Sequence, residues 1–312
     1  MNFKSFLLIM GTLGMSLLSV GCSKDDSASE EVVDNSPYIK DGALIRASYK
    51  VSANKRVYFS QGNLQFNATL GTHATADGTA SGTWRFSDCQ FDREGYANAN
   101  ASEDFSGWID LFGWGTSGWS GGVKAYQPWA TSSTISDYYI DGNKSNSMMG
   151  IYSKADWGVY NAISNGGNEP GLWRTLTYDE SKYLWQNNKW TLGYVMNNFV
   201  LLLIPEDFKA PSGITVNIIT SGSTEWEKNK YASEEFRKLE KLGVVAFSCG
   251  MGVRLGADVS SVDVESNFWT STAVGVEAWC LCPGEYEGVY GVGNFAVKRN
   301  YANSVRLVQD VQ

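Results

Sequence analysis

The amino-terminal half of the chain alternates apolar and polar residues in short runs. Three such runs lie at 56–60, 63–67 and 83–87. A period of two is typical of strands with one buried face. Gln61 and Gly62 separate the first two runs, and this spacing predicts a hairpin. We therefore expect short strands joined by tight turns in this half.

The carboxy-terminal half contains a longer apolar run and two helical patterns. Residues 200–204 are continuously apolar, which predicts a central strand buried on both faces. Thr177 and Glu180 form a capping box before one helix. Ser233 can cap a second helix, which Gly243 would end. We also expect a short helix at 156–164 and strands at 214–219, 244–249, 268–272, 278–282, 294–298 and 304–309. Few helices beside many short strands indicate an α+β fold.

Residues 105–130 follow neither period, because four tryptophans lie among many glycines. We expect a folded loop whose aromatic rings pack over turns. The rings could form a stacking platform for sugars, or they could anchor the loop on the core. The second interpretation is favoured, since the loop has few aliphatic residues and must bury something to stay ordered.

Residues 1–21 have the features of a lipoprotein signal peptide. Lys4 precedes an apolar stretch at 6–18, which is too short to span a membrane. The small residues before Cys22 resemble a lipobox, which implies that Cys22 becomes the acylated first residue. The following Ser-Lys-Asp-Asp resembles the export signal of Bacteroidota surface lipoproteins. This resemblance implies a lipid-anchored protein exposed on the outer membrane.

The remaining chain divides into three parts. Residues 22–41 are polar and acidic, which predicts a disordered tether. Residues 42–150 form a β-rich region with many glycines and tryptophans, and we expect it to pack on a following domain at 151–312.

Composition narrows the possible functions. With 43% hydrophobic and 19% charged residues, the chain has the balance of a globular protein. Its net charge of −8 argues against nucleic-acid binding, which needs clustered basic residues. His73 is the single histidine, so a catalytic triad or a multi-histidine zinc site would have to use it.

Four cysteines remain besides Cys22: Cys89, Cys249, Cys280 and Cys282. An exported protein can form disulfides, and four cysteines allow three pairings. Buried free thiols are the alternative. In a strand, Cys280 and Cys282 would share one face. With a single histidine and no Cys-x-x-Cys pair, we do not expect a structural zinc site. We also expect no cofactor.

Several segments occur in an order that resembles one family. They are residues 171–177, the strand ending at Ile204-Pro205, and residues 244–247, 252–254, 268–272 and 304–308. Together they resemble the C-type lectin-like fold in its formylglycine-generating-enzyme-like branch. This branch includes surface lipoproteins of the major-paralogous-domain group and variable proteins of diversity-generating retroelements. The resemblance covers residues 151–312.

The resemblance implies a ligand site on the loop-rich face, just before residues 304–308. The region 273–303 is rich in tyrosine and asparagine, which give contact area and hydrogen bonds at low entropic cost. Ordinary loops and strand ends are the alternative. We assign as ligand contacts Trp279, Tyr286, Tyr290, Tyr301 and Asn294, with Trp114 and Trp119 as second candidates.

The sequence also departs from the family. Glu169-Pro170-Gly171 and Gln127-Pro128-Trp129 lack the third ligand of a calcium-dependent lectin. The oxidases of the family use a copper-binding cysteine pair separated by four residues, unlike Cys280 and Cys282. Both departures argue against metal-dependent sugar binding and oxidase activity.

We therefore expect a non-catalytic, surface-anchored lipoprotein that binds a glycan or a cell-surface protein, or that serves in adhesion. One alternative is an enzyme, either a formylglycine-generating type that uses Cys280 and Cys282 or a hydrolase with a carboxylate pair. Its candidate carboxylates are Asp104, Asp110, Asp137 and Asp141. A structural subunit of the cell envelope is the third hypothesis.

Overall fold

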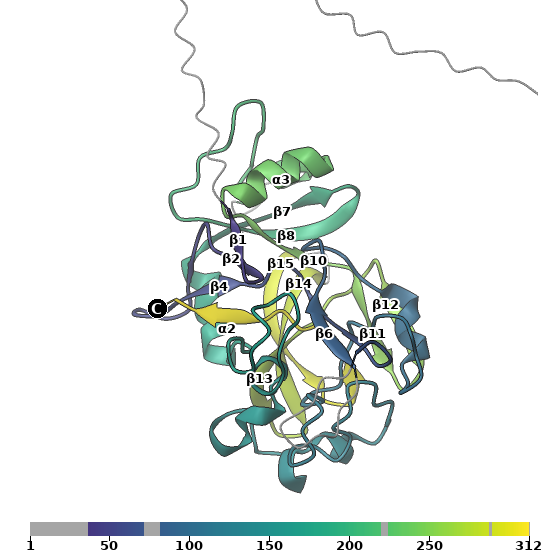
Figure 1. The fold of residues 1–312 in the computed structure, drawn as a ribbon. Helices are drawn as coiled ribbons and strands as arrows, with labels where there is room; N and C mark the ends of the chain where they lie inside the picture. Colours follow the sequence, from purple (N-terminus) through teal and green to yellow (C-terminus); the bar gives the residue numbers. More distant parts are fainter. Residues whose placement is uncertain (1–36, 72–81, 220–223, 287–288, 312) are drawn as a thin grey trace, which may run out of the picture. The chain divides into compact units, whose positions relative to one another are not determined.

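The computed structural model describes residues 37–71, 82–219, 224–286 and 289–311. Residues 37–312 form one compact unit that mixes helices with small sheets, which confirms the α+β class (Figure 1). The fold begins earlier than expected. β1 (Ile39–Lys40) pairs with β2 (Ala43–Leu44), so residues 39–41 belong to the fold and not to the tether.

The described strands form six small sheets. The largest has the order β10-β8-β7-β9, with β7 at Lys189–Val195, β8 at Asn198–Ile204, β9 at Lys230–Tyr231 and β10 at Val245–Ser248. A second sheet, β12-β11-β16, joins Asp258–Val262, Met251–Leu255 and Tyr301–Ala302. A third, β13-β14-β15, joins Phe268–Val274, Glu277–Tyr286 and Val289–Lys298. A fourth, β17-β4-β3, joins Val308–Asp310, Arg56–Phe59 and Tyr49–Lys50, and β5 (Leu64–Asn67) pairs with β6 (Thr83–Phe86).

The two predicted caps have different outcomes. α2 (Tyr178–Asn187) begins at the expected capping box, in which Thr177 and Glu180 exchange side-chain to backbone hydrogen bonds of 3.2 and 3.0 Å. α3 (Ser233–Lys241) is capped at Ala232 and not at Ser233, because the carboxylate of Glu235 accepts from the Ala232 N–H. The other helical turns are α1 (Trp157–Tyr160), η1 (Gly95–Asn100), η2 (Ile135–Tyr138), η3 (Ile140–Gly142), η4 (Gly150–Ala155) and η5 (Glu225–Lys228).

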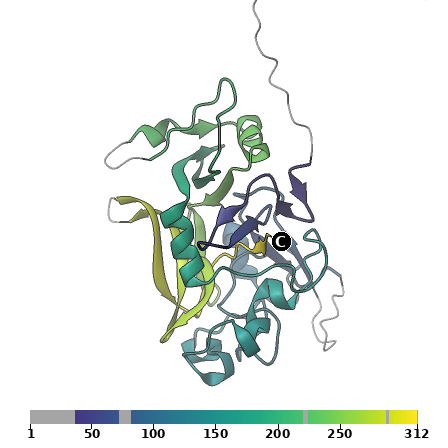
Figure 2. The ribbon, with the colours of Figure 1, turned by 90° about the vertical axis from the view of Figure 1, so that its left-hand side faces the viewer.

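β8 separates two hydrophobic clusters. Leu201 and Leu203 face one cluster, whereas Leu202 faces another that includes Phe236 of α3. All three leucines have an exposed fraction of 0%. Hydrogen bonds to β7 and β10 occupy both edges of β8, so the predicted central strand is confirmed. Figure 1 shows α3 over β7 and β8, and Figure 2 shows α2 across the β13-β14-β15 sheet.

The hairpin predicted between residues 56–60 and 63–67 is wrong. β4 pairs with β3 and β17, while β5 pairs with β6. The Ser60 N–H donates to the Leu307 carbonyl at 3.0 Å, and the Leu64 N–H donates to the Val305 carbonyl at 2.9 Å. The predicted strands therefore form backbone hydrogen bonds with residues near the end of the chain, and not with each other.

The strand predicted at 214–219 is also wrong, since its described part has no strand conformation. β7 pairs with β9, and side chains hold the segment instead. The Asn229 Oδ1 accepts from the Asn217 N–H at 2.8 Å, and the Thr191 hydroxyl donates to the Asn217 carbonyl at 2.6 Å. Hydrogen bonds from side chains thus hold this segment, in place of the strand-to-strand backbone hydrogen bonds that the apolar pattern predicted.

Residues 299–310, the closing segment, are hydrogen-bonded to both predicted regions of the chain. Asn303 and Phe112 exchange backbone hydrogen bonds of 3.0 and 2.9 Å. The Trp269 N–H donates to the Ser304 carbonyl at 3.0 Å. Residues 302–308 are all buried. The regions 42–150 and 151–312 therefore interleave within one compact unit.

Three buried arginines bind loop carbonyls around this segment. Arg254 donates to the Gly256 carbonyl at 2.6 Å, Arg299 to the Glu277 carbonyl at 3.0 Å, and Arg306 to the Gln90 carbonyl at 3.1 Å. Burial lowers the pKa of Arg254 and Arg299 to about 10 and that of Arg306 to about 9. Each guanidinium is therefore protonated at neutral pH and keeps its full set of N–H donors.

An ion-pair network ties the last strand to α2. Arg174 contacts Glu180 at 2.6 Å and Asp310 at 2.7 Å, and Lys55 contacts both carboxylates. Burial alone would raise the pKa of Glu180 and of Asp310. The hydrogen bonds and charge of Arg174 outweigh burial and hold both pKa values below their ordinary range.

This network predicts acid sensitivity. Carboxyl groups whose pKa is lower in the folded state stabilise the protein above their unfolded pKa, and this stability is lost as pH falls through the folded pKa. Arg174→Met should cost about 1–2 kcal/mol at pH 7, and its difference from wild type should shrink below pH ~4. Denaturant unfolding at several pH values measures this. The exposed control Arg237→Met should stay near wild type throughout, and a pH-independent cost of Arg174→Met would contradict the assignment.

Candidate functional site

Trp279 and Tyr178 form a half-buried aromatic pair at the surface. Trp279 lies in β14 and Tyr178 is the first residue of α2. Their rings stack with centroids 4.2 Å apart and planes inclined by 26°. The Lys182 ammonium lies 6.0 Å from the Tyr178 ring centroid. A sheet and a capped helix therefore hold two flat rings beside an exposed cation.

Asn294 lies on the same face of the sheet as Trp279. It is opposite Leu281, two residues from Trp279 along β14, and side chains of one face recur at every second position. Its side-chain oxygen accepts from the Ser181 hydroxyl of α2 at 2.8 Å. The structure thus brings two of the predicted contacts, Trp279 and Asn294, to one surface between α2 and the sheet.

The remaining contacts in the carboxy-terminal region do not join them. Tyr301 is half-buried in β16 and pairs with Leu255, in a different sheet. The backbones of Tyr286 and Tyr290 lie at the end of the β14–β15 pair where the chain passes from one strand to the other, but their side chains lie outside the described residues. Cys22 and His73 also lie outside the described part of the chain.

The second candidates pack inward. Trp114 has an exposed fraction of 0%, donates its indole N–H to the Thr270 carbonyl at 2.9 Å, and is stacked by Arg299. It is therefore a core residue, and its assignment as a ligand contact is wrong. Trp119 is half-buried over Gly121, where a Cβ would lie 2.7 Å from its ring. These contacts agree with the favoured interpretation of the loop, in which the rings anchor it to the core.

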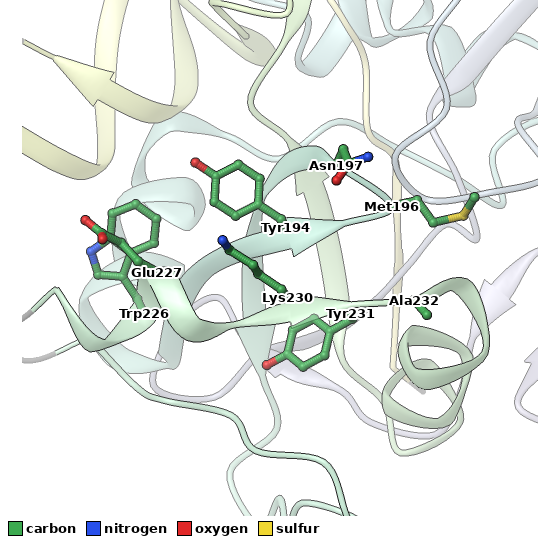
Figure 3. Close-up of a pocket in the computed structure, with 8 residues that line it drawn as sticks. All are labelled: Tyr194, Met196, Asn197, Trp226, Glu227, Lys230, Tyr231 and Ala232. Carbon is green, nitrogen blue, oxygen red and sulfur yellow. The ribbon is translucent and has the colours of Figure 1, made fainter.

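A pocket of about 580 Å³ lies at the end of the four-stranded sheet (Figure 3). This pocket was not predicted, because β7 was not among the expected strands, although residues 189–195 partly alternate. Met196 and Asn197 form the turn after β7, both with positive φ. The lining residues are Tyr194, Met196, Asn197, Trp226, Glu227, Lys230, Tyr231 and Ala232.

The pocket combines aromatic rings with charged and amide groups. The Lys230 ammonium lies 5.9 Å from the Tyr194 ring centroid, and Figure 3 shows the ammonium directed toward the ring. Trp226 and Tyr231 are only 4% and 5% exposed, so they form its floor more than its walls. Such a site could hold a small polar ligand, and its volume lies in the usual range for ligand sites.

The cysteine pair lacks the accessibility that an oxidase would need. Cys280 and Cys282 share one face and one hydrophobic cluster, as predicted, and are 0% and 1% exposed. Burial raises the pKa of Cys280 and disfavours the reactive thiolate. None of the four described cysteines forms a disulfide, so the alternative of buried thiols holds for Cys249, Cys280 and Cys282.

The candidate carboxylates serve local structure. Asp110 is fully buried and accepts hydrogen bonds from the Glu94 N–H and the Asn98 amide at 2.7 and 2.8 Å. Burial raises the pKa of Asp110 to about 7, but no surface of this residue is open to a substrate. Asp137 binds Lys124 and Ser132, whereas Asp141 accepts from Tyr152, and Asp104 is exposed.

Two negative findings apply to the described residues. No three acidic, histidine or cysteine side chains gather there in a way that could hold a metal ion. In the same part of the chain, no helix has the length and apolar character needed to cross a bilayer.

Comparison of the sequence and structure with family models, curated proteins and solved structures finds no match.

The burial of the thiols predicts selective alkylation. In the folded protein iodoacetamide should modify Cys89, which is exposed, while Cys249, Cys280 and Cys282 should react only after denaturation. Intact-mass spectrometry of residues 37–312 before and after denaturation counts the adducts. Rapid modification of Cys280 in the folded chain would show an accessible thiol pair and would favour the oxidase hypothesis.

Proposed function

We propose that this protein is a non-catalytic lipoprotein of the cell surface that binds a glycan or a partner protein. The observation that supports this most is the stacked Trp279–Tyr178 pair, with Asn294 on the same face. Flat, partly exposed rings suit the apolar face of a sugar or the side chains of a protein. Because α2 and β14 hold the rings in place, little conformational entropy is lost on binding.

The proposed fold is C-type lectin-like, in its formylglycine-generating-enzyme-like branch. In that fold the two ends of the domain lie in adjacent strands. Here Val308 of β17, near the end of the region 151–312, forms an antiparallel bridge with Arg174, near its start. The segment 304–308, which carries part of the sequence resemblance, is fully buried. These features support the proposal.

The proposal predicts that the stacked pair carries much of the binding energy. An array of glycans and cell-surface proteins probed with residues 37–312 would identify a ligand. Trp279→Ala should then weaken binding roughly thirtyfold or more, as for other large aromatic contacts. Tyr286→Ala, Tyr290→Ala and Tyr301→Ala test the other predicted contacts. Trp119→Ala, a matched change of a half-buried tryptophan elsewhere, should change affinity by no more than about twofold.

The outcome also separates the two candidate sites. Retained folding of each variant is checked by thermal melting. If Trp279→Ala binds like wild type while Tyr194→Ala abolishes binding, the ligand occupies the pocket of Figure 3 and the stacked pair is scaffold.

Lipid anchoring is tested on Cys22. Labelled palmitate should enter the wild-type protein and not Cys22→Ala, because the acyl chains would be attached to that cysteine. Protease added to intact cells should remove the protein if it is exposed on the outer membrane. Survival of the protein until the cells are lysed would place it inside the envelope and contradict surface display.

A further inference from the structure

β15 is a long strand at the edge of its sheet. It spans Val289–Lys298 and is the last strand in the order β13-β14-β15. It pairs with β14 at ten successive positions without a register shift. In an antiparallel pair, half of the N–H and C=O groups of an edge strand point away from the neighbour. Figure 2 shows the β14–β15 pair along the margin of the compact unit.

The opposite edge of this sheet is covered. In β13 the Trp269 N–H donates to the Ser304 carbonyl and the Ser271 N–H to the Leu176 carbonyl, at 3.0 and 2.9 Å. β13 also has an irregular register against β14. The two edges therefore differ: bonds to other segments occupy one, while no described strand pairs with the other.

β15 lacks the devices that usually prevent strand addition. Proteins protect long edges with proline, bulges, short strands or several charged residues. β15 contains no proline, has no bulge, and carries one charged residue, Lys298, at its last position. A ten-residue edge of this kind favours pairing with another strand.

The side chains of β15 are complementary to a second copy of the same strand. Phe295 is 45% exposed, and its ring lies against the Cα of Gly293, where a Cβ would be 2.4 Å away. Antiparallel pairing centred on Asn294 would place each Phe295 opposite the Gly293 of the other copy. Aromatic rings over glycines stabilise β-sheet edges.

We propose that two copies of this protein associate through β15, antiparallel and centred on Asn294. The contact repeats twice about a twofold axis, as a closed dimer requires. The two Lys298 side chains lie at opposite ends of the paired strands, whereas a parallel pairing in register would place them together. The result is a continuous six-stranded sheet.

This dimer would place two Trp279–Tyr178 surfaces on one side of the joined sheet, because Asn294 and Trp279 share a face. Two linked sites can bind a repetitive ligand more tightly than one. The dimer itself does not depend on the proposed ligand-binding function.

Sedimentation of residues 37–312, a compact unit that contains all three hydrophobic clusters, tests the association. We expect a dimer at protein concentrations of about 100 µM or below. Phe295→Lys should weaken it about tenfold or more without a large change in melting temperature. A monomer throughout this range, or a dimer that Phe295→Lys leaves unchanged, would overturn the proposal.

Cross-linking of the full-length chain in cells tests the register. In a Cys89→Ser background, Asn294→Cys should give a disulfide-linked dimer on a non-reducing gel, since the two positions face each other across the twofold axis. Ile151→Cys, at a position 82% exposed, is the matched control for random collisions. Equal cross-linking of both variants, or none at position 294 in a correctly folded chain, would contradict the proposed pairing.

Discussion

Buried guanidinium groups bound to loop carbonyls hold this protein together around its closing segment. Arg299 and Arg306 belong to that segment, and Arg254 lies in β11, which pairs with it. None of these groups forms an ion pair with a described carboxylate, and each donates mainly to carbonyl and side-chain amide oxygens. Removing a charge from water is costly, and the hydrogen bonds that each guanidinium donates offset part of that cost.

This constraint explains how a chain with small sheets and long irregular loops forms one unit. Arg299 alone contacts the carbonyls of Lys144, Gly275 and Glu277 and stacks on Trp114. Three separate segments of the chain are therefore tied to one side chain. The same segment accepts backbone hydrogen bonds from Ser60, just after β4, and from Leu64, the first residue of β5. The two predicted regions therefore fold around a common centre. That frame fixes the positions of α2 and β14, and thereby of the surface aromatic pair.

Local features of the sequence predicted local structure well. The capping box of α2, the buried run of β8 and the shared face of Cys280 and Cys282 each depend on neighbouring residues, and the structure contains all three. The hairpin at 56–67 was wrong because its partner, the segment around Leu307, lies more than two hundred residues away in the chain. Trp114 was misassigned for a related reason: a glycine-rich loop gives no periodic signal of which ring faces inward. The pocket at Tyr194 depends on β9 and η5, whose approach to β7 has no sequence signature.

Native-state hydrogen exchange tests most directly whether the closing segment unites the chain. The amides of Ser60 and Leu64 in the amino-terminal part and those of Trp269 and Arg174 in the carboxy-terminal part all donate to carbonyls of this segment. If the segment is the common centre, these four amides open together, with one free energy equal to that of global unfolding. Exchange of Ser60 and Leu64 at a clearly lower free energy than Trp269 and Arg174 would show two separately unfolding parts and contradict the central role of the closing segment.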